Sequence, residues 1–247
     1  MTKWATWIII GLAAILLLLT WLINRRNPFT HLRHIDVYKS LQRQNLVAFE
    51  QGKRFIFAIG GQFSAQDMSI GGIIGLPVLS KLSRQTVYGD QAALALSGDG
   101  SLACLSQLVL AGVYKDALVP ELFSMDHTQF TGTTGMAYLG GVLPEIHKGI
   151  NGGLVMIGHL RPEMALAVDL AGRHETYCVA ASDSPGSQAV FFASLPQAVI
   201  GEEYYAAGAN FETHPIEAAS LHVQDILRIL IILALIVGAL SKVMGLF

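Results

Sequence analysis

Polar side chains that could bind a ligand or move a proton stand where short apolar runs give way to helical patterns. Each run is rich in Val, Leu, Ile and Ala, and Ser, Asp, His or Gly follows it. In an open sheet of parallel strands such positions meet at one edge, where ligands bind. Carboxylates, imidazoles and hydroxyls together could hold a small polar molecule or support acid–base chemistry. The candidate ligand-binding residues are Ser97, Asp99, Ser101, Asp126, His127, His159 and Asp183.

The same residues have a structural explanation, because Ser and Asp are common N-caps of helices. Ser101, Asp126 and residues 182–184 are of these types and stand near the start of helical patterns. Pro162 and Pro185 suit the first turn of a helix. Capping is the more common role of such residues. The pattern is compatible with capping and with ligand binding.

Other kinds of chemistry lack their usual residue patterns. No Ser stands in a Gly-x-Ser-x-Gly elbow, so we expect no catalytic nucleophile. The histidines show no spacing typical of a zinc site, and the two cysteines, Cys104 and Cys178, form no Cys-x-x-Cys motif. We therefore expect no catalytic residue, no metal site and no cofactor. The net charge of −2 gives no reason to expect a nucleic-acid partner.

The elements that must position these residues alternate between strand and helix. Short apolar runs predict strands, and each is followed by a helical pattern. This alternation is typical of βαβ units and a mainly parallel sheet. The fold class predicted is therefore α/β and Rossmann-like. The expected strands cover residues 54–60, 93–97, 118–125, 153–158 and 176–181.

An uncharged run of twenty residues, 4–23, predicts a first transmembrane helix. Trp4, Trp7 and Trp21 lie near its ends, where aromatic side chains anchor a span. A cleaved signal peptide is the alternative, but the run is long for one and lacks a small-residue cleavage site. Basic residues follow the run, so the positive-inside rule places the next domain in the cytoplasm.

A second apolar run, 226–247, ends the chain and is interrupted by Arg228 and Lys242. Its uncharged part, 229–241, would by itself fit an interfacial helix. Because both basic side chains can extend to the interfaces, we expect a second transmembrane helix. The protein would then lie in the cell membrane, with the lipid bilayer as a partner and a cytoplasmic domain between two spans.

These segments divide the chain into four parts. Residues 1–24 form the N-terminal transmembrane helix, and 25–51 form a juxtamembrane connecting helix. The α/β domain covers 52–213, and the C-terminal transmembrane helix with its lead-in covers 214–247. The hydrophobic content of 52% and the mean hydropathy of +0.49 agree with a chain that is partly in a membrane.

The stretch before the second apolar run combines two adjacent carboxylates with very small residues. On a helix the two carboxylates point about 100° apart, so they cannot share one face. Small residues allow a second helix to approach closely. We expect this stretch to close the domain and to form an assembly seam, with candidate residues Gly201, Glu202, Glu203, Ala206, Ala207 and Gly208.

Two short motifs in this stretch, Ile-Gly-Glu-Glu at 200–203 and Ala-Ala-Gly-Ala at 206–209, carry a resemblance. With the hydrophobic helix after them, they resemble a family of uncharacterised bacterial and archaeal membrane proteins. That family has an N-terminal span, an α/β domain and a Gly-Glu-Glu…Ala-Gly-Ala motif. Residues 48–52 are similar to its domain start, and Asn210 stands where the family has an aromatic residue. The resemblance implies topology and domain extent and brings no activity.

The absent catalytic patterns and the many small-residue helix faces favour a membrane-anchored, non-catalytic scaffold or complex subunit that forms a homo-oligomer. The alternative is a membrane-anchored enzyme or a sensor of a small polar ligand, with a cleft at the carboxyl ends of the strands. A small transporter subunit is a third hypothesis, which the lack of carboxylates in the apolar runs disfavours.

Overall fold

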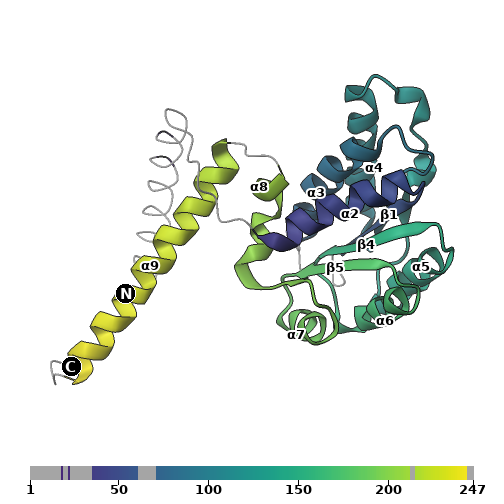
Figure 1. Cartoon of the computed structure of the whole chain (residues 1–247). Coiled ribbons are helices and arrows are strands. Elements are labelled where there is room, and N and C mark those ends of the chain that lie inside the picture. The colour runs from purple at the N-terminus through teal and green to yellow at the C-terminus, as the bar shows by residue number, and fades with distance from the viewer. Residues whose placement is uncertain (1–17, 19–21, 23–34, 61–70, 212–214, 244–247) are drawn as a thin grey trace. The chain divides into compact units, whose positions relative to one another are not determined.

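The computed structural model of the chain describes residues 18, 22, 35–60, 71–211 and 215–243 (Figure 1). The chain divides into two compact units. One unit is Ile35–Phe211, and the other comprises Met1–His34 and Glu212–Phe247. The sites described below lie in Ile35–Phe211.

A six-stranded parallel sheet runs through this unit, so the predicted α/β fold with a parallel sheet is confirmed. The strand order is β3-β2-β1-β4-β5-β6, which is that of a doubly wound sheet. Its carboxyl edge has a topological switch point between β1 and β4. The strands are β1 (Arg54–Gly60), β2 (Leu94–Ser97), β3 (Thr128–Phe130), β4 (Asn151–Gly158), β5 (Tyr177–Ser182) and β6 (Ala198–Val199).

The expected strand at 118–125 is wrong. Two short 3-10 turns occupy this region, η1 (Pro120–Leu122) and η2 (Met125–His127), and β3 begins only at Thr128. Pro120 has no N–H to donate to a neighbouring strand, and Leu118 has a φ of 62°, outside the extended region. The apolar residues here therefore belong to turns on the surface.

Helices cover both faces of the sheet (Figure 1). On one side lie α2 (Asp36–Glu50), α3 (Gly71–Thr86) and α4 (Gly100–Asp116). On the other side lie α5 (Gly135–His147), η3 (Pro162–Met164), α6 (Ala165–Arg173) and α7 (Pro185–Ser194). Right-handed crossovers place successive helices on one face until the chain passes the switch point, and then on the other. Strands buried on both faces explain the continuous apolar runs of β1, β2 and β4.

Helix α2 belongs to the α/β unit, although we expected residues 25–51 to be a connecting helix outside it. Its buried residues, Tyr38, Leu41, Asn45 and Ala48, recur at helical spacing and face the sheet and α3. The Asn45 amide also donates to the Leu82 carbonyl at 3.0 Å. The apolar stripe thus packs on a core. The remaining predicted part, 25–34, lies outside the described residues.

The two ends of the α/β unit meet. The Ile35 amide donates to the Asn210 side chain at 3.2 Å, and the Tyr38 hydroxyl donates to the Glu203 carbonyl at 3.1 Å. Between them, η4 (Gly201–Ala206) and α8 (Ala207–Phe211) pack against α2 and α3. The segment therefore closes the domain, as a 3-10 turn that continues into a short α-helix.

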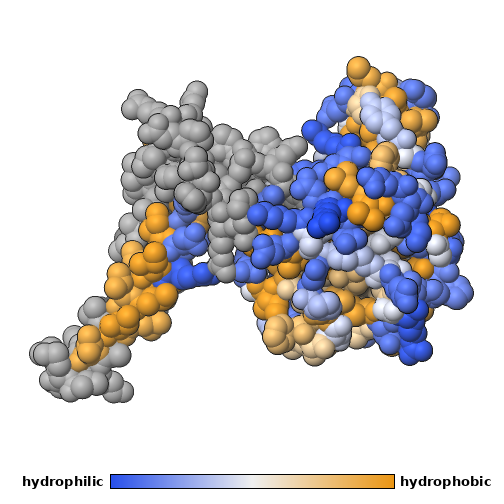
Figure 2. Space-filling model, viewed as in Figure 1, coloured by the Kyte–Doolittle hydropathy of each residue, from blue (hydrophilic) through white to orange (hydrophobic). Residues whose placement is uncertain are grey.

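Helix α9 (Pro215–Val243) belongs to the other unit. Its apolar side chains from Ile229 to Leu233 are all exposed, and it presents a long apolar surface (Figure 2). Within the described part of the chain, no helix combines the length and hydropathy needed to cross a membrane. The predicted first span, 4–23, lies outside the described residues apart from Leu18 and Leu22.

Candidate functional site

At the carboxyl edge of the sheet, His159 and Asp183 form a close pair. Each follows a strand, and the parallel register of β4 and β5 sets Gly158 opposite Ser182, so the next residues along both strands are neighbours. His159 Nδ1 lies 2.8 Å from Asp183 Oδ1, and both side chains are partly exposed. A carboxylate on Nδ1 orients an imidazole and fixes its tautomer, which is an arrangement used in acid–base sites. The structure thus brings together two of the candidates that follow strands in the sequence.

The two loops that carry this pair are held together by buried hydroxyls. Ser182 Oγ accepts from the Leu160 and Ser184 amides, each at 3.2 Å. Ser187 Oγ donates to the Leu160 carbonyl at 2.6 Å. These hydrogen bonds fix the backbone of both loops, so the His159–Asp183 pair stands on a rigid base.

Next to this pair, η3 carries a second charged contact. Arg161 Nε lies 3.6 Å from Glu163 Oε1. The other carboxylate oxygen of Glu163 is buried and has no hydrogen-bond partner among the described residues. A buried carboxylate oxygen without a partner is costly, so this atom is a polar group that a ligand or a water could satisfy.

Of the three candidates at and after the end of β2, Asp99 is the one whose side chain caps a helix. Asp99 is the N-cap of α4 and accepts from the Ser101 amide at 2.6 Å and the Leu102 amide at 3.4 Å. Ser97 is fully buried, and its hydroxyl has no hydrogen-bond partner in the described part of the chain. Ser101 is exposed. Capping therefore explains Asp99, which leaves it a weaker ligand-binding candidate than Asp183.

Asp126 and His127 lie at the opposite, amino edge, and their predicted convergence with the other candidates was wrong. They precede β3, because the strand that we expected before them is absent. The His127 ring packs on Tyr114 and Phe123, with centroids 5.7 and 5.9 Å away. Burial lowers the pKa of His127; the neighbouring Asp126 carboxylate opposes this shift, and Arg54 adds to it. This histidine is part of an aromatic cluster.

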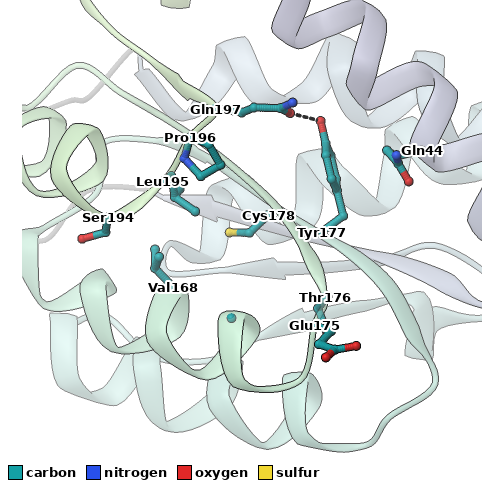
Figure 3. Close-up of a pocket in the computed structure, with 11 residues that line it drawn as sticks. Gln44, Val168, Glu175, Thr176, Tyr177, Cys178, Ser194, Leu195, Pro196 and Gln197 are labelled. Atoms are coloured by element: carbon teal, nitrogen blue, oxygen red, sulfur yellow. Dashed lines mark hydrogen bonds between the residues drawn. The ribbon is translucent and has the colours of Figure 1, made fainter.

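The amino edge also holds a cavity of about 580 Å³ (Figure 3). Its walls come from α6, β5 and the segment before β6, and its lining is mainly apolar. The Tyr177 hydroxyl donates to the Gln197 amide oxygen, and Ser40 Oγ lies 3.0 Å from that hydroxyl. Burial raises the pKa of the Cys178 thiol to about 12, so this thiol is a poor nucleophile. None of the sequence-based candidates lines this cavity.

One pair of titratable residues was missed by the sequence analysis. His147 and His174, at the ends of α5 and α6, bring their ring nitrogens to 3.2 Å from each other. They are 27 residues apart in the chain, so no local spacing could have shown the contact. No group of three or more His, Cys, Asp or Glu in the described residues is arranged to hold a metal ion.

The predicted assembly seam consists of η4 and α8, which pack mainly inward. Tyr204 is buried, and its hydroxyl donates to the Gly71 carbonyl. Lys81 Nζ donates to the Gly208 carbonyl. Ala206 and Ala207 are buried as well, while Gly201 and Glu202 are exposed. The small residues thus allow close packing within the domain.

A family model described as a domain of unknown function, DUF6754, matches residues 1–247. No curated protein and no solved structure matches the chain. The match agrees with the expected resemblance to an uncharacterised family, whereas the membrane features and the motif of that resemblance stay predictions. Since the family model covers all of the sequence, the chain belongs to the DUF6754 family.

Proposed function

We propose that this protein is a membrane-anchored, non-catalytic scaffold or complex subunit that assembles with copies of itself. The observation that supports this most is the character of α4, which is apolar on its outer side as well as on its packed side. Leu102, Leu110 and Val113 are buried against the domain, while Leu105 and Leu108 face solvent, with Leu108 68% exposed. Helices that are apolar all round normally lie inside proteins.

The exposed apolar surface extends beyond α4 to the turns that pack against it. Leu118, Leu122 and Met125 all point to solvent, and Leu118 is 86% exposed. Large apolar side chains that are exposed on neighbouring elements mark candidate sites of protein interaction. We call the exposed residues Leu105 and Leu108 of α4, together with Leu118, Leu122 and Met125, the α4 patch. A second copy of the chain would cover it.

The membrane part of the proposal rests on the terminal apolar runs. The exposed apolar side chains of α9 would be covered by lipid or by another apolar helix. Arg25, Arg26 and Arg33 follow the first run, which favours a cytoplasmic α/β domain. Protease treatment of oriented vesicles tests this: sealed vesicles with the cytoplasmic side enclosed should protect residues 35–211, and cleavage there would contradict the orientation.

Cys104 gives a direct test of assembly, because it is exposed on the outer face of α4. A short bismaleimide should link two copies through Cys104, and light scattering in detergent should show an oligomer. Leu108→Lys should abolish both, since it places a charge in the α4 patch. Leu166→Lys is the matched control: it introduces the same charge at an exposed leucine on α6, outside the α4 patch, and should assemble normally. A strict monomer without cross-links would refute the proposal.

A second candidate function is a sensor of, or an enzyme for, a small polar ligand at the carboxyl edge. The 2.8 Å contact between His159 and Asp183 favours it. Thermal unfolding with nucleotides, divalent metals and small carboxylic acids should then show a stabilising ligand. Asp183→Asn should lose this stabilisation, and Asp126→Asn, at the opposite edge, should keep it. If no compound stabilises the unaltered protein, this candidate function fails.

A further inference from the structure

The contact between His147 and His174 follows from the way α5 and α6 pack. The two helices lie side by side on the same face of the sheet, and both end at its amino edge. His147 is the last residue of α5, and His174 follows α6 as its C-cap. Both side chains are exposed, and their rings are nearly perpendicular at 83°, with centroids 5.1 Å apart. A solvent ion could therefore reach both.

We propose that His147 and His174 form a two-histidine binding site for Zn²⁺ or a similar transition-metal ion. Zinc binds imidazole nitrogen at about 2.0–2.1 Å in tetrahedral geometry, which sets two ligand nitrogens about 3.3–3.4 Å apart. The observed separation of His147 Nδ1 and His174 Nε2 is 3.2 Å. Two such nitrogens need almost no movement to share one ion. Solvent would fill the remaining coordination positions.

The electrostatics at this place favour a cation. The C-terminal ends of α5 and α6 each carry partial negative charge, and both point here. Two basic neighbours are already paired: Arg173 contacts Asp169 at 2.8 Å, and Lys148 contacts Glu145 at 2.6 Å. Lys53 lines a pocket together with His174, but it is exposed, so solvent screens its charge. The next residue, Glu175, adds a carboxylate beside the pair. An approaching metal ion thus meets little uncompensated positive charge.

A hydrogen bond between the two rings is the competing explanation for their contact. The two explanations differ in whether one of the facing ring nitrogens carries a proton. In a hydrogen bond one of the two facing nitrogens carries a proton, whereas a metal ion needs a lone pair on both. On metal binding the protonated ring would shift its proton to its other nitrogen, so neutral rings bind without net proton release. His174→Gln separates the cases, because a glutamine amide can still hydrogen-bond to His147 but is a poor zinc ligand.

Calorimetric titration of the full chain with Zn²⁺ tests the site. We expect one ion to bind to the unaltered protein, and His147→Ala, His174→Ala and His174→Gln each to weaken that binding by more than about tenfold, since even outer-shell changes cost 10–100-fold. His127→Gln, which alters a histidine outside the pair, should bind as the unaltered protein does. Equal zinc binding by all four variants would overturn the proposal. So would normal binding by His174→Gln when both alanine variants lose it, and so would an unaltered protein that binds no zinc.

Discussion

Gly158 occupies a position at the switch point where the backbone leaves no room for a side chain. Its φ is +130°, and a Cβ built there would overlap the carbonyl oxygen of Gly60 on the neighbouring strand. Strain of this kind costs on the order of 1–3 kcal/mol. Gly158→Ala should therefore lower the free energy of unfolding by at least about 2 kcal/mol in urea titration.

A glycine in open surroundings provides the comparison. Gly140 lies within α5, and a Cβ there would meet no atom within 4 Å. Gly140→Ala should raise the free energy of unfolding by about 0.5–1 kcal/mol, because alanine is the better helix former. If both substitutions had the same effect, the tight contact between Gly158 and Gly60 would not matter for stability.

Tyr138 should make the free energy of unfolding fall with rising pH in the alkaline range. It is fully buried, its hydroxyl donates to the Leu96 carbonyl at 3.3 Å, and burial raises its pKa above the usual value of about 10. A raised pKa means that the folded state keeps the proton longer, so this stabilisation is complete below pH 10 and is lost as the pH rises further. Tyr138→Phe should reduce the loss of stability between about pH 10 and 11.

The measurement is the midpoint of urea unfolding at several pH values. Some alkaline dependence should remain in the variant, because burial also raises the pKa of Tyr38 and Tyr204. An unchanged slope in Tyr138→Phe would contradict the assignment.

At the scale of elements, the η4–α8 segment packs on α2 and α3 and is joined to them by specific hydrogen bonds. The buried Tyr204 hydroxyl donates to the Gly71 carbonyl at the start of α3. Tyr204→Phe should lower the free energy of unfolding by about 1 kcal/mol, since a buried acceptor loses its donor. The adjacent Tyr205 is 53% exposed, so Tyr205→Phe should change stability by less than about 0.5 kcal/mol in the same urea titration. A reversed order of the two effects would show that the segment does not dock through Tyr204.

The elements that sequence patterns predicted well are those with long apolar runs. β1, β4 and β5 are buried over most of their length, and their sequences show it. β3 has only three residues, two of them exposed, so it has no apolar run, and the nearby run at 118–125 was assigned as the strand in its place. The apolar residues of α2 recur at helical spacing, so a helix was predictable. This spacing does not show whether the apolar stripe packs on the α/β core or on another surface.

Only those parts of the candidate site that follow directly from the ends of the strands could be predicted from the sequence. His159 and Asp183 follow two strands that pair in register, so knowing the strands was enough to bring them together. Asp126 was placed wrongly because one strand was placed wrongly. The His147–His174 contact depends on the lengths and relative rotation of α5 and α6, which are set by packing against the core and leave no mark in local sequence.

For the molecule as a whole, the division into two units has a testable consequence. All residues of the α4 patch lie in Ile35–Phe211, which has its own core. A fragment of residues 35–211 should therefore unfold in one cooperative transition by circular dichroism, and bismaleimide should still link it through Cys104. A fragment that folds but does not cross-link would show that assembly depends on the terminal segments.

The hydrogen bond between Ile35 and Asn210 means that the chain enters and leaves the α/β unit at the same place. A pulling force applied between residues 34 and 212 would act on this contact first. The two ends would separate before the force acted on the sheet. The same proximity would let the natural ends be joined and new ones opened in a surface turn, because domains whose ends adjoin tolerate circular permutation. The unit is thus built as a module that can be inserted into another chain without stretching.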